Sequence, residues 1–329
     1  ATSPIETTNG FSAATRLRRY TATAAMMLAL VLPIVREMAE DGASRKALLL
    51  SVPLAANVGG LGTPIGSPPN AIALEYMRSI GEAPSFARWM MVGVPLASII
   101  LVLVWVLLVY GYRAKGRVDG IECDPLHLKR SAGRRIVMTT AVITAGSWLT
   151  SEWHGWSSGT VALIPVIVFF GLGLLRVPDL RALSWDVLLL MGGGLCLGAA
   201  LSESGLAAWV VEQLNVDQLS SFELMGAFAV VACAISTVMS NTATANLMMP
   251  MVLGLSIGAK SPILLAMAFG CSLAMALPIS TPPNAMAFSS GELHVGDILK
   301  PGLLVSILGL ILILTIGYWW WGFTGLSGG

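Results

Sequence analysis

The sequence predicts an all-α integral membrane protein whose helices are interrupted at membrane depth. Of its 329 residues, 55% are hydrophobic and 11% are charged, whereas a soluble domain carries about 25% charged residues. Uncharged runs at 89–112, 155–175 and 301–329 reach or exceed the ~20 residues that cross a bilayer. These runs are continuously apolar, whereas the strands of a membrane β-barrel alternate apolar and polar residues.

Polar segments interrupt three other apolar stretches. Ser240-Asn241-Thr242 lies inside a run without charge from Leu224 to Ala259. Glycine and paired proline interrupt residues 47–74 at 57–70, and Pro-Pro-Asn interrupts residues 262–291 at 277–284. Proline ends or kinks a helix, and irregular backbone in lipid must be buried in protein or line a wet cavity. Such breaks are typical of transporters, which use them to hold a substrate and its coupling ion.

In the first half of the chain we expect one incomplete hairpin, one broken helix and one span. Residues 1–19 form an atypical polar segment. The apolar segment 20–35 is too short to cross a bilayer, so we expect it to form one arm of a re-entrant hairpin. Residues 47–74 predict helix, loop and helix, and 89–112 predict a full span. The basic loop 113–135 predicts the cytoplasmic side, because cytoplasmic loops are rich in Lys and Arg.

The second half predicts three spans, an interfacial helix, a hairpin, a broken helix and a last span. Glycines at 192–194 and 198 permit close helix packing, and Trp153 and Trp156 are expected as interfacial anchors. The elements expected are spans at 136–151, 160–175 and 187–202, an interfacial helix at 205–218, a hairpin at 222–259 with its tip at Ser240-Asn241-Thr242, a broken helix at 262–291, and a span at 301–323 with Trp319, Trp320 and Trp321 at the outer interface.

This layout sets the predicted orientation. It places all Lys and Arg residues inside except Arg78, Arg88 and Lys260, and that asymmetry supports the crossings. The C-terminus is expected outside. Six regions follow: a foreign or atypical segment 1–19, a first transport region 20–82, a span with the basic loop 83–135, scaffold and interfacial helices 136–220, a second transport region 221–300, and a last span 301–329.

Two pairs of motifs recur in the same order in the two halves. Residues 21–27, Thr-Ala-Thr-Ala-Ala-Met-Met, resemble residues 242–249, and residues 66–73, Gly-Ser-Pro-Pro-Asn-Ala-Ile-Ala, resemble residues 280–287. The expected topology runs the first broken helix outward and the second inward. The sequence therefore predicts an inverted-topology repeat, with binding where the two breaks meet near the midplane.

With Ser240-Asn241-Thr242 and the paired Pro-Pro-Asn motifs, the sequence resembles the divalent anion:sodium symporter family over nearly all of residues 20–323. The resemblance implies sodium-coupled transport of dicarboxylates, citrate or sulfate by a homodimer, with an elevator-type motion of a transport domain against a scaffold. The implied substrate-binding residues are Ser240, Asn241, Thr242, Thr281, Pro282, Ser67, Pro68 and Thr21. The implied sodium ligands are Ser236, Met239, Asn241 and Ser280 at a second site, and Gly66 at a partial first site.

The first hairpin departs from the family pattern. Arg19-Tyr20 stands where Ser-Asn is expected, a polar segment replaces an apolar arm, and the family's earlier helices are absent. The chain is therefore expected to be truncated, with an incomplete first sodium site and scaffold.

Neither break contains Lys or Arg, so a bound dianion would depend on hydroxyls, amides, helix N-termini and co-bound cations. Asn241 can serve both ligands, its carbonyl oxygen facing a cation and its NH2 group facing a carboxylate. Taken with the ion and substrate class that the family resemblance implies, this predicts sodium symport of C4-dicarboxylates such as succinate, in a bacterial-type inner membrane.

Other functions stay open. A proton-coupled or antiporting carrier of citrate or sulfate would need an ionisable residue in the membrane, and the breaks contain none. An inactive remnant of a transporter is the second alternative. An enzyme is disfavoured, because His127, His154 and His294 lie in loops and Ser240 has no candidate base. The widely spaced cysteines do not form a metal motif, and nothing indicates nucleic-acid binding.

Overall fold

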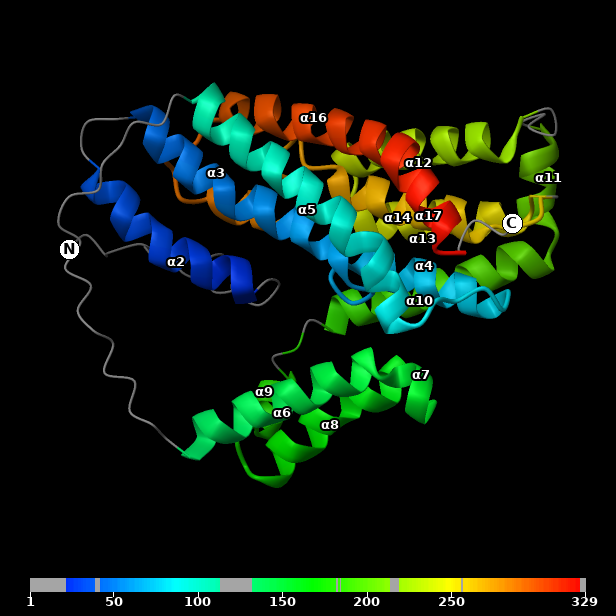
Figure 1. Cartoon of the computed structure of the whole chain (residues 1–329), viewed down its shortest axis with the longest axis horizontal. Coiled ribbons are helices and arrows are strands. Elements are labelled where there is room, and N and C mark those ends of the chain that lie inside the picture. The colour runs from blue at the N-terminus through cyan, green and yellow to red at the C-terminus, as the bar shows by residue number, and fades with distance from the viewer. Residues whose placement is uncertain are drawn as a thin grey trace, which may run out of the picture.

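The computed structural model describes residues 22–38, 42–112, 132–181, 183, 185–213, 219–255 and 257–325 (Figure 1). Every regular element in that part of the chain is a helix, which confirms the predicted all-α class. Within it, three helices are long and apolar enough to cross a membrane, or four if one bent pair forms a single span. The three are α5 (Phe86–Gly111), α12 (Ser221–Val238) and the continuous run Val295–Phe323.

The first half contains the predicted broken helix. After α2 (Ala22–Glu37), the helix α3 (Gly42–Gly59) passes into the short 3-10 turn η1 (Gly60–Gly62), and α4 (Pro68–Ser79) resumes beyond it. Proline at the first turn of α4 suits its start, since those N–H groups have no helical partner. The helix α3 begins earlier than predicted and therefore includes Arg45 and Lys46.

Helices α6 (Ala132–Leu149), α7 (Ser151–His154), α8 (Ser158–Gly171) and α9 (Val177–Arg181) form a unit set apart from the other helices in Figure 1. Phe86 at the start of α5 stacks on Trp148, with ring centroids 5.0 Å apart. The spans predicted at 136–151 and 160–175 are not among the candidate spans found in the described part. The 14 residues of α8 measure about 21 Å, whereas the hydrocarbon core is about 30 Å thick.

Two glycines let α10 (Trp185–Glu203) approach its neighbours closely. A Cβ on Gly194 would come within 2.0 Å of the Asn246 amide, and one on Gly198 within 1.8 Å of the Tyr76 hydroxyl. The close packing predicted for these glycines is present, whereas Gly192 and Gly193 have nothing within 4 Å. The next helix, α11 (Leu206–Gln213), turns by 73° from α10, where an interfacial helix was predicted; residues 214–218 lie outside the described part.

The helix α14 (Ser261–Leu273) lies at the centre of the core, and all its residues are buried. It packs against α12 so closely that a Cβ on Gly270 would lie 2.6 Å from the Ala229 carbonyl oxygen. Helix α13 (Asn241–Leu253) follows α12, and the short α15 (Pro282–Phe288) follows α14 after the second predicted break.

The last span begins at Val295, six residues before the predicted start, so α16 (Val295–Leu312) includes Asp297 and Lys300. It continues through the π-helical turn η3 (Ile313–Gly317) into α17 (Tyr318–Phe323). Of the three tryptophans predicted at the outer interface, Trp321 is fully buried and packs edge-on against Phe269. Trp319 is 71% exposed.

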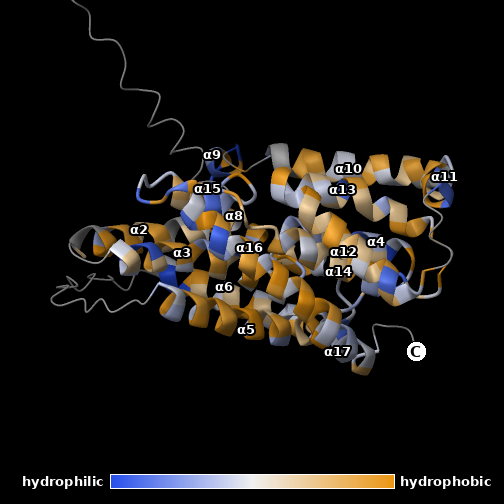
Figure 2. Ribbon diagram, turned by 90° about the horizontal axis from the view of Figure 1, so that it is seen from above, coloured by the Kyte–Doolittle hydropathy of each residue, from blue (hydrophilic) through white to orange (hydrophobic). Residues whose placement is uncertain are grey.

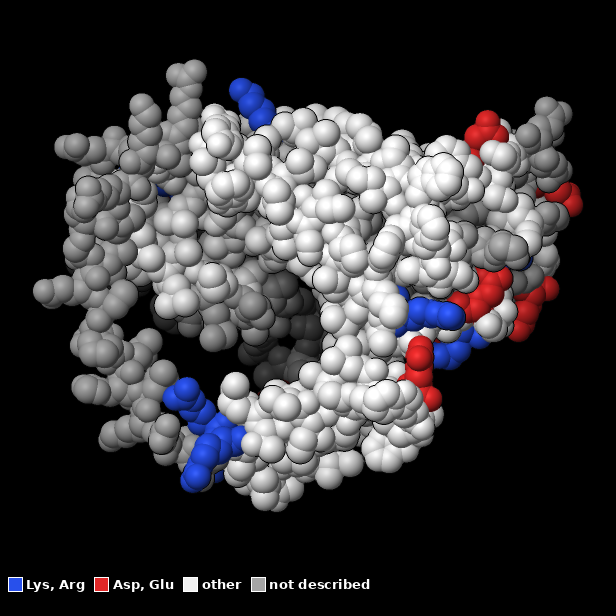
Figure 3. Space-filling model, viewed as in Figure 1, with Lys and Arg blue, Asp and Glu red and all other residues white. Residues whose placement is uncertain are grey.

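The surface is that of a membrane protein. Hydrophobic residues dominate the ribbons in Figure 2, and many large ones, including Trp105, Ile167 and Leu189, face outward. In Figure 3 the visible charged side chains lie toward the two ends of the molecule and leave the face between them largely uncharged. This distribution fits helices that run through hydrocarbon with polar ends in water.

Candidate functional site

The segment around Ser240 forms the tip of a helical hairpin. The backbone leaves the helical conformation at Met239, where φ is −107° and ψ is 175°, and the Ser240 hydroxyl accepts a hydrogen bond from the Ala243 N–H to cap α13. At the other end of α13, Gly254 lies against Ala207 of α11, which precedes α12 in the chain. Both arms therefore return to the same end of the molecule.

Two buried serines connect this tip to the second break. The Ser236 hydroxyl donates to Asn241 Oδ1 at 2.7 Å and lies 3.4 Å from the Cys271 carbonyl oxygen. The Ser280 hydroxyl donates to the Thr237 carbonyl oxygen at 2.7 Å. Three predicted second-site residues, Ser236, Asn241 and Ser280, therefore lie together at the end of α12, while the Met239 side chain is exposed.

The second break is an ordered loop closed by Asn284. Its side-chain amide donates to the carbonyl oxygens of Met275 at 2.8 Å and Leu277 at 3.1 Å. Its backbone N–H donates to the Thr281 hydroxyl, which caps α15. Since unpaired buried carbonyls are costly, Asn284 stabilises the unwound segment.

The first break is closed in the same way by Asn70. Its side-chain amide donates to the carbonyl oxygens of Gly60 and Thr63, both at 2.9 Å. The loop folds back so tightly that a Cβ on Gly66 would lie 2.2 Å from the Gly60 carbonyl oxygen. Only glycine permits this approach of two backbones. Gly66, predicted as a partial first-site ligand, is exposed.

The two breaks contact each other directly. Asn57, near the end of α3, donates to the Thr281 hydroxyl at 3.0 Å and to Asn284 Oδ1 at 3.2 Å. A second contact joins the other two half-helices: Ser67 at the start of α4 shares a 2.9 Å hydrogen bond with Ser272 near the end of α14. Helix α3 packs against α15, and α4 packs against α14, so the two broken segments run antiparallel.

The predicted substrate residues differ in exposure. Pro68, Ser240 and Pro282 are exposed and Ser67 and Asn241 are half-buried, whereas Thr242 and Thr281 are buried. Thr21 lies outside the described residues. Sequence reasoning missed Asn57 and Ser272 as site residues. Asn57 was the first residue of the break predicted at 57–70, and Ser272 is a polar side chain near the end of the apolar half-helix before the second break. Those positions were the available signal.

The site is polar without being ionised. None of the hydrogen-bonding side chains that join the hairpin tip to the breaks is a carboxylate, amine or guanidinium. Helices α4 and α13 begin at Pro68 and Asn241, so two predicted binding segments are helix N-termini. The positive end of each helix dipole favours anions, although Pro68 and Pro69 at the start of α4 have no N–H group to donate.

An uncharged polar site formed by a hairpin tip and two broken helices, within an apolar helical body, is an arrangement typical of secondary membrane transporters. A family model described as citrate transporter matches residues 19–270 and residues 148–327. The chain belongs to this citrate transporter family. The predicted resemblance to anion transporters is thereby confirmed, and the matched proteins are transporters and not enzymes.

Individual relatives carry different anions by name. The chain is 32% identical over 304 residues to the sodium-dependent dicarboxylate transporter SdcS of Staphylococcus saprophyticus, a match that covers 83% of this chain and 58% of SdcS. It is 34% identical over 306 residues to SdcS of Staphylococcus aureus, with the same coverage. It is also 32% identical over 309 residues to the low-affinity phosphate transporter PHO90 of Saccharomyces cerevisiae, covering 88% of this chain and 34% of PHO90. The chain thus spans between one third and three fifths of these relatives.

Proposed function

We propose that this chain forms the ion- and substrate-binding part of a sodium-coupled symporter of C4-dicarboxylates such as succinate. The observation that carries the proposal is the uncharged network in which Asn57 meets Thr281, Ser67 meets Ser272, and Ser236 meets Asn241. Such a site has no fixed cation to neutralise a dianion, so anion binding depends on bound sodium. The names of the SdcS relatives support both the ion and the substrate class.

The proposed substrate residues are Ser67, Pro68, Thr281, Pro282 and the hairpin tip Ser240-Asn241-Thr242, with Thr21 as a further candidate. The positive dipole end of α13 would lie beside one carboxylate, and that of α4, which begins with two prolines, beside the other. Both helices begin within this set of residues.

Sodium is proposed to bind at the second site through oxygens of Ser236, Met239, Asn241 and Ser280. The backbone supplies part of this set, because the last carbonyls of α12 have no helical partner beyond Val238. Unwound carbonyls and helix ends are the usual sodium ligands in broken-helix transporters. Gly66 would belong to a partial first site.

We also propose that the two halves form an inverted-topology repeat that moves as an elevator within a homodimer. The antiparallel breaks and the shared role of Asn70 and Asn284 support the repeat. A further correspondence involves the spans that follow the breaks. A Cβ on Gly93 of α5 would lie 2.4 Å from the Leu61 carbonyl oxygen, and one on Gly302 of α16 would lie 2.3 Å from the Met275 carbonyl oxygen.

Phosphate is the second candidate substrate, and the similarity to PHO90 over 88% of this chain favours it. Proton coupling or antiport of citrate or sulfate, and an inactive remnant, are the remaining alternatives. These alternatives differ in the coupling ion and in the anion that the chain is expected to bind.

Binding to the purified 329-residue chain tests the proposal, because the relatives are longer and uptake could depend on their additional residues. Calorimetry should show succinate binding in sodium chloride and loss of that binding in choline chloride at constant pH. Phosphate and citrate are titrated as competitors. Equal succinate binding without sodium would overturn the sodium coupling, and tighter binding of phosphate than succinate would overturn the substrate. Absence of binding by any of these anions would favour the inactive remnant.

A further inference from the structure

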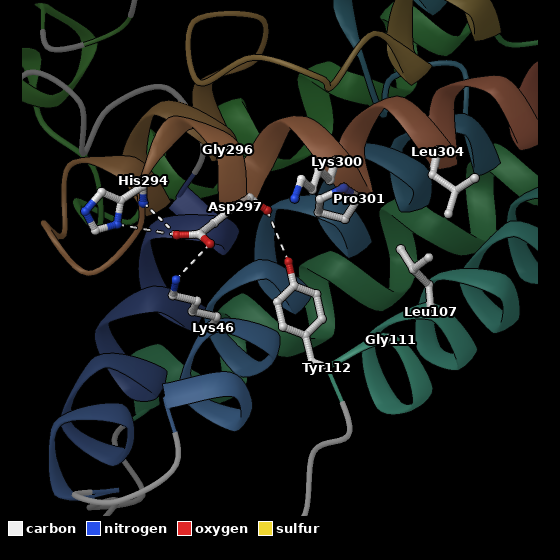
Figure 4. A pocket seen from close by; sticks show the side chains of 10 residues that line it. All are labelled: Lys46, Leu107, Gly111, Tyr112, His294, Gly296, Asp297, Lys300, Pro301 and Leu304. Carbon is white, nitrogen blue, oxygen red and sulfur yellow. Dashed lines mark hydrogen bonds and ion pairs between the residues drawn. The ribbon is translucent and has the colours of Figure 1, made fainter.

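A cavity away from the proposed transport site lies at one end of the helices α3, α5 and α16 (Figure 4). Its volume is about 560 Å³. Apolar side chains, chiefly Leu107, Pro301 and Leu304, form one wall. Polar side chains form the other, and these are Lys46, Tyr112, His294, Asp297 and Lys300. The cavity shares no lining residue with the network at the two breaks.

The single carboxylate in this cavity is already neutralised. Asp297 Oδ1 accepts a 2.8 Å hydrogen bond from Lys46 Nζ, and Asp297 Oδ2 accepts one of 2.9 Å from the His294 backbone N–H. The Tyr112 hydroxyl donates to the Asp297 carbonyl oxygen at 3.2 Å. The ion pair joins α3 to α16 across 251 positions of the chain.

Lys300 supplies an excess positive charge. It is exposed, and the described part of the chain contains no hydrogen-bond or ion-pair partner for its ammonium group. Two lysines and one carboxylate line the cavity, so Lys300 adds a positive charge beyond the Lys46–Asp297 ion pair. The electrostatics therefore favour an anion at the polar wall.

The position of the cavity adds a second requirement for its ligand. Both α5 and α16 belong to candidate membrane spans, and the cavity lies at the last turns of α5 and the first turns of α16. Leu107 lies about one turn inside the end of α5 at Gly111, and Leu304 lies on α16 beyond Lys300. In Figure 4 these two leucines lie side by side, away from the charged groups. A charged wall and an apolar wall therefore share one opening, so a ligand that fills the cavity contacts both.

We propose that this cavity binds one anionic glycerophospholipid, with its phosphate beside Lys300 and Lys46 and an acyl chain along Leu107 and Leu304. Basic pockets between membrane helices are suited to anionic head groups. The lipid would contact helices from both halves of the chain, α3 and α5 from the first and α16 from the second. Bound there, it would stabilise their packing.

The test is a lipid titration of the purified full chain in detergent, followed by native mass spectrometry. Phosphatidylglycerol and phosphatidylcholine with identical acyl chains are compared, with inorganic phosphate as a competitor. We expect retention of phosphatidylglycerol over phosphatidylcholine. Lys300→Gln should lower phosphatidylglycerol affinity about fivefold, the effect of removing one lysine near an anionic head group. Lys300→Arg should preserve it.

Arg88→Gln is the matched control, since it removes an exposed positive charge at the opposite end of α5. Leu304→Gln should also lower lipid affinity if an acyl chain lies against that wall, with no effect on binding of inorganic phosphate. Equal retention of both lipids would overturn the proposal, as would equal losses in the Lys300 and Arg88 variants. Full displacement of the lipid by millimolar phosphate would mean that the cavity binds a free anion and not a lipid.

Discussion

Asn70 and Asn284 hold the two unwound segments in the same way, each by donating its side-chain amide to two backbone carbonyls of the loop before its own helix. The distances are 2.9 and 2.9 Å for Asn70 and 2.8 and 3.1 Å for Asn284. Both side chains are almost fully buried. The recurring Pro-Pro-Asn motif therefore has a structural meaning in each half: proline starts the second half-helix, and asparagine stabilises the break before it.

The first prediction follows from this relationship. Asn70→Ala and Asn284→Ala should each lower the free energy of unfolding by about 2–3 kcal/mol, because each leaves buried carbonyls unsatisfied. Thermal unfolding in detergent measures the effect. Ser289→Ala is the control, since that exposed hydroxyl donates to the Met286 carbonyl oxygen three residues earlier. Parent-like unfolding of both asparagine variants would show that the breaks do not depend on these amides.

The second prediction concerns the dual role proposed for Asn241. Asn241→Asp keeps the oxygen that Ser236 contacts at 2.7 Å, so sodium binding should survive or strengthen. The new carboxylate would repel a substrate carboxylate by about 4 kcal/mol at ~4 Å and an effective dielectric constant of 20, which lowers affinity about a thousandfold.

Sodium and succinate binding are measured on the same purified Asp variant. Asn241→Ala provides the comparison, because it should weaken binding of both ligands without unfolding the protein. Parent-like succinate affinity in the Asp variant would place Asn241 away from the substrate.

The third prediction tests Asn57, which sequence reasoning missed. Asn57→Ala removes the donor that holds the Thr281 hydroxyl and Asn284 Oδ1. We expect succinate affinity to fall about five- to tenfold, the effect of about 1–1.5 kcal/mol from a lost hydrogen bond. Ser79→Ala at the exposed end of α4 serves as the control. If both variants bind succinate equally well, Asn57 does not position the site.

The fourth prediction uses the two close backbone approaches. Gly93→Ala and Gly302→Ala would place a Cβ 2.4 and 2.3 Å from carbonyl oxygens of the two breaks, so the spans must move away. Overpacking of this kind costs about 1–3 kcal/mol, and an inverted repeat predicts similar losses at the two positions. Gly146→Ala, with nothing within 4 Å, should leave the unfolding temperature unchanged or raise it. A loss at only one of the two glycines would contradict their equivalence.

The fifth prediction concerns orientation. Lys129, which lies outside the described residues, is expected in the cytoplasm, and Lys260 outside. Single cysteines at these positions in a cysteine-free background should react with an impermeant reagent from opposite sides of sealed vesicles. If both positions react from the same side, the predicted crossings and the inverted repeat are refuted.

Much of the fold could be predicted because its signals are local. Runs of apolar residues specify helices in lipid, and glycine with paired proline specifies where a helix cannot continue. The start of α4 at Pro68 and of α15 at Pro282 follow directly from those residues. The hairpin tip at Ser240 is local too, since its hydroxyl caps the helix that follows.

The sequence by itself thus determined the all-α membrane class and where the helices break, because helix propensity and hydrophobicity act within a few neighbouring residues. Only the tertiary structure decided which of these segments meet. Asn57 and Thr281 are 224 positions apart, and Ser67 and Ser272 are 205 apart, so no local pattern pairs them. The burial of Trp321 beside Phe269 was decided in the same way. A buried polar or aromatic side chain takes whichever partner the packing of distant helices brings near it, and that choice depends on the whole folded chain.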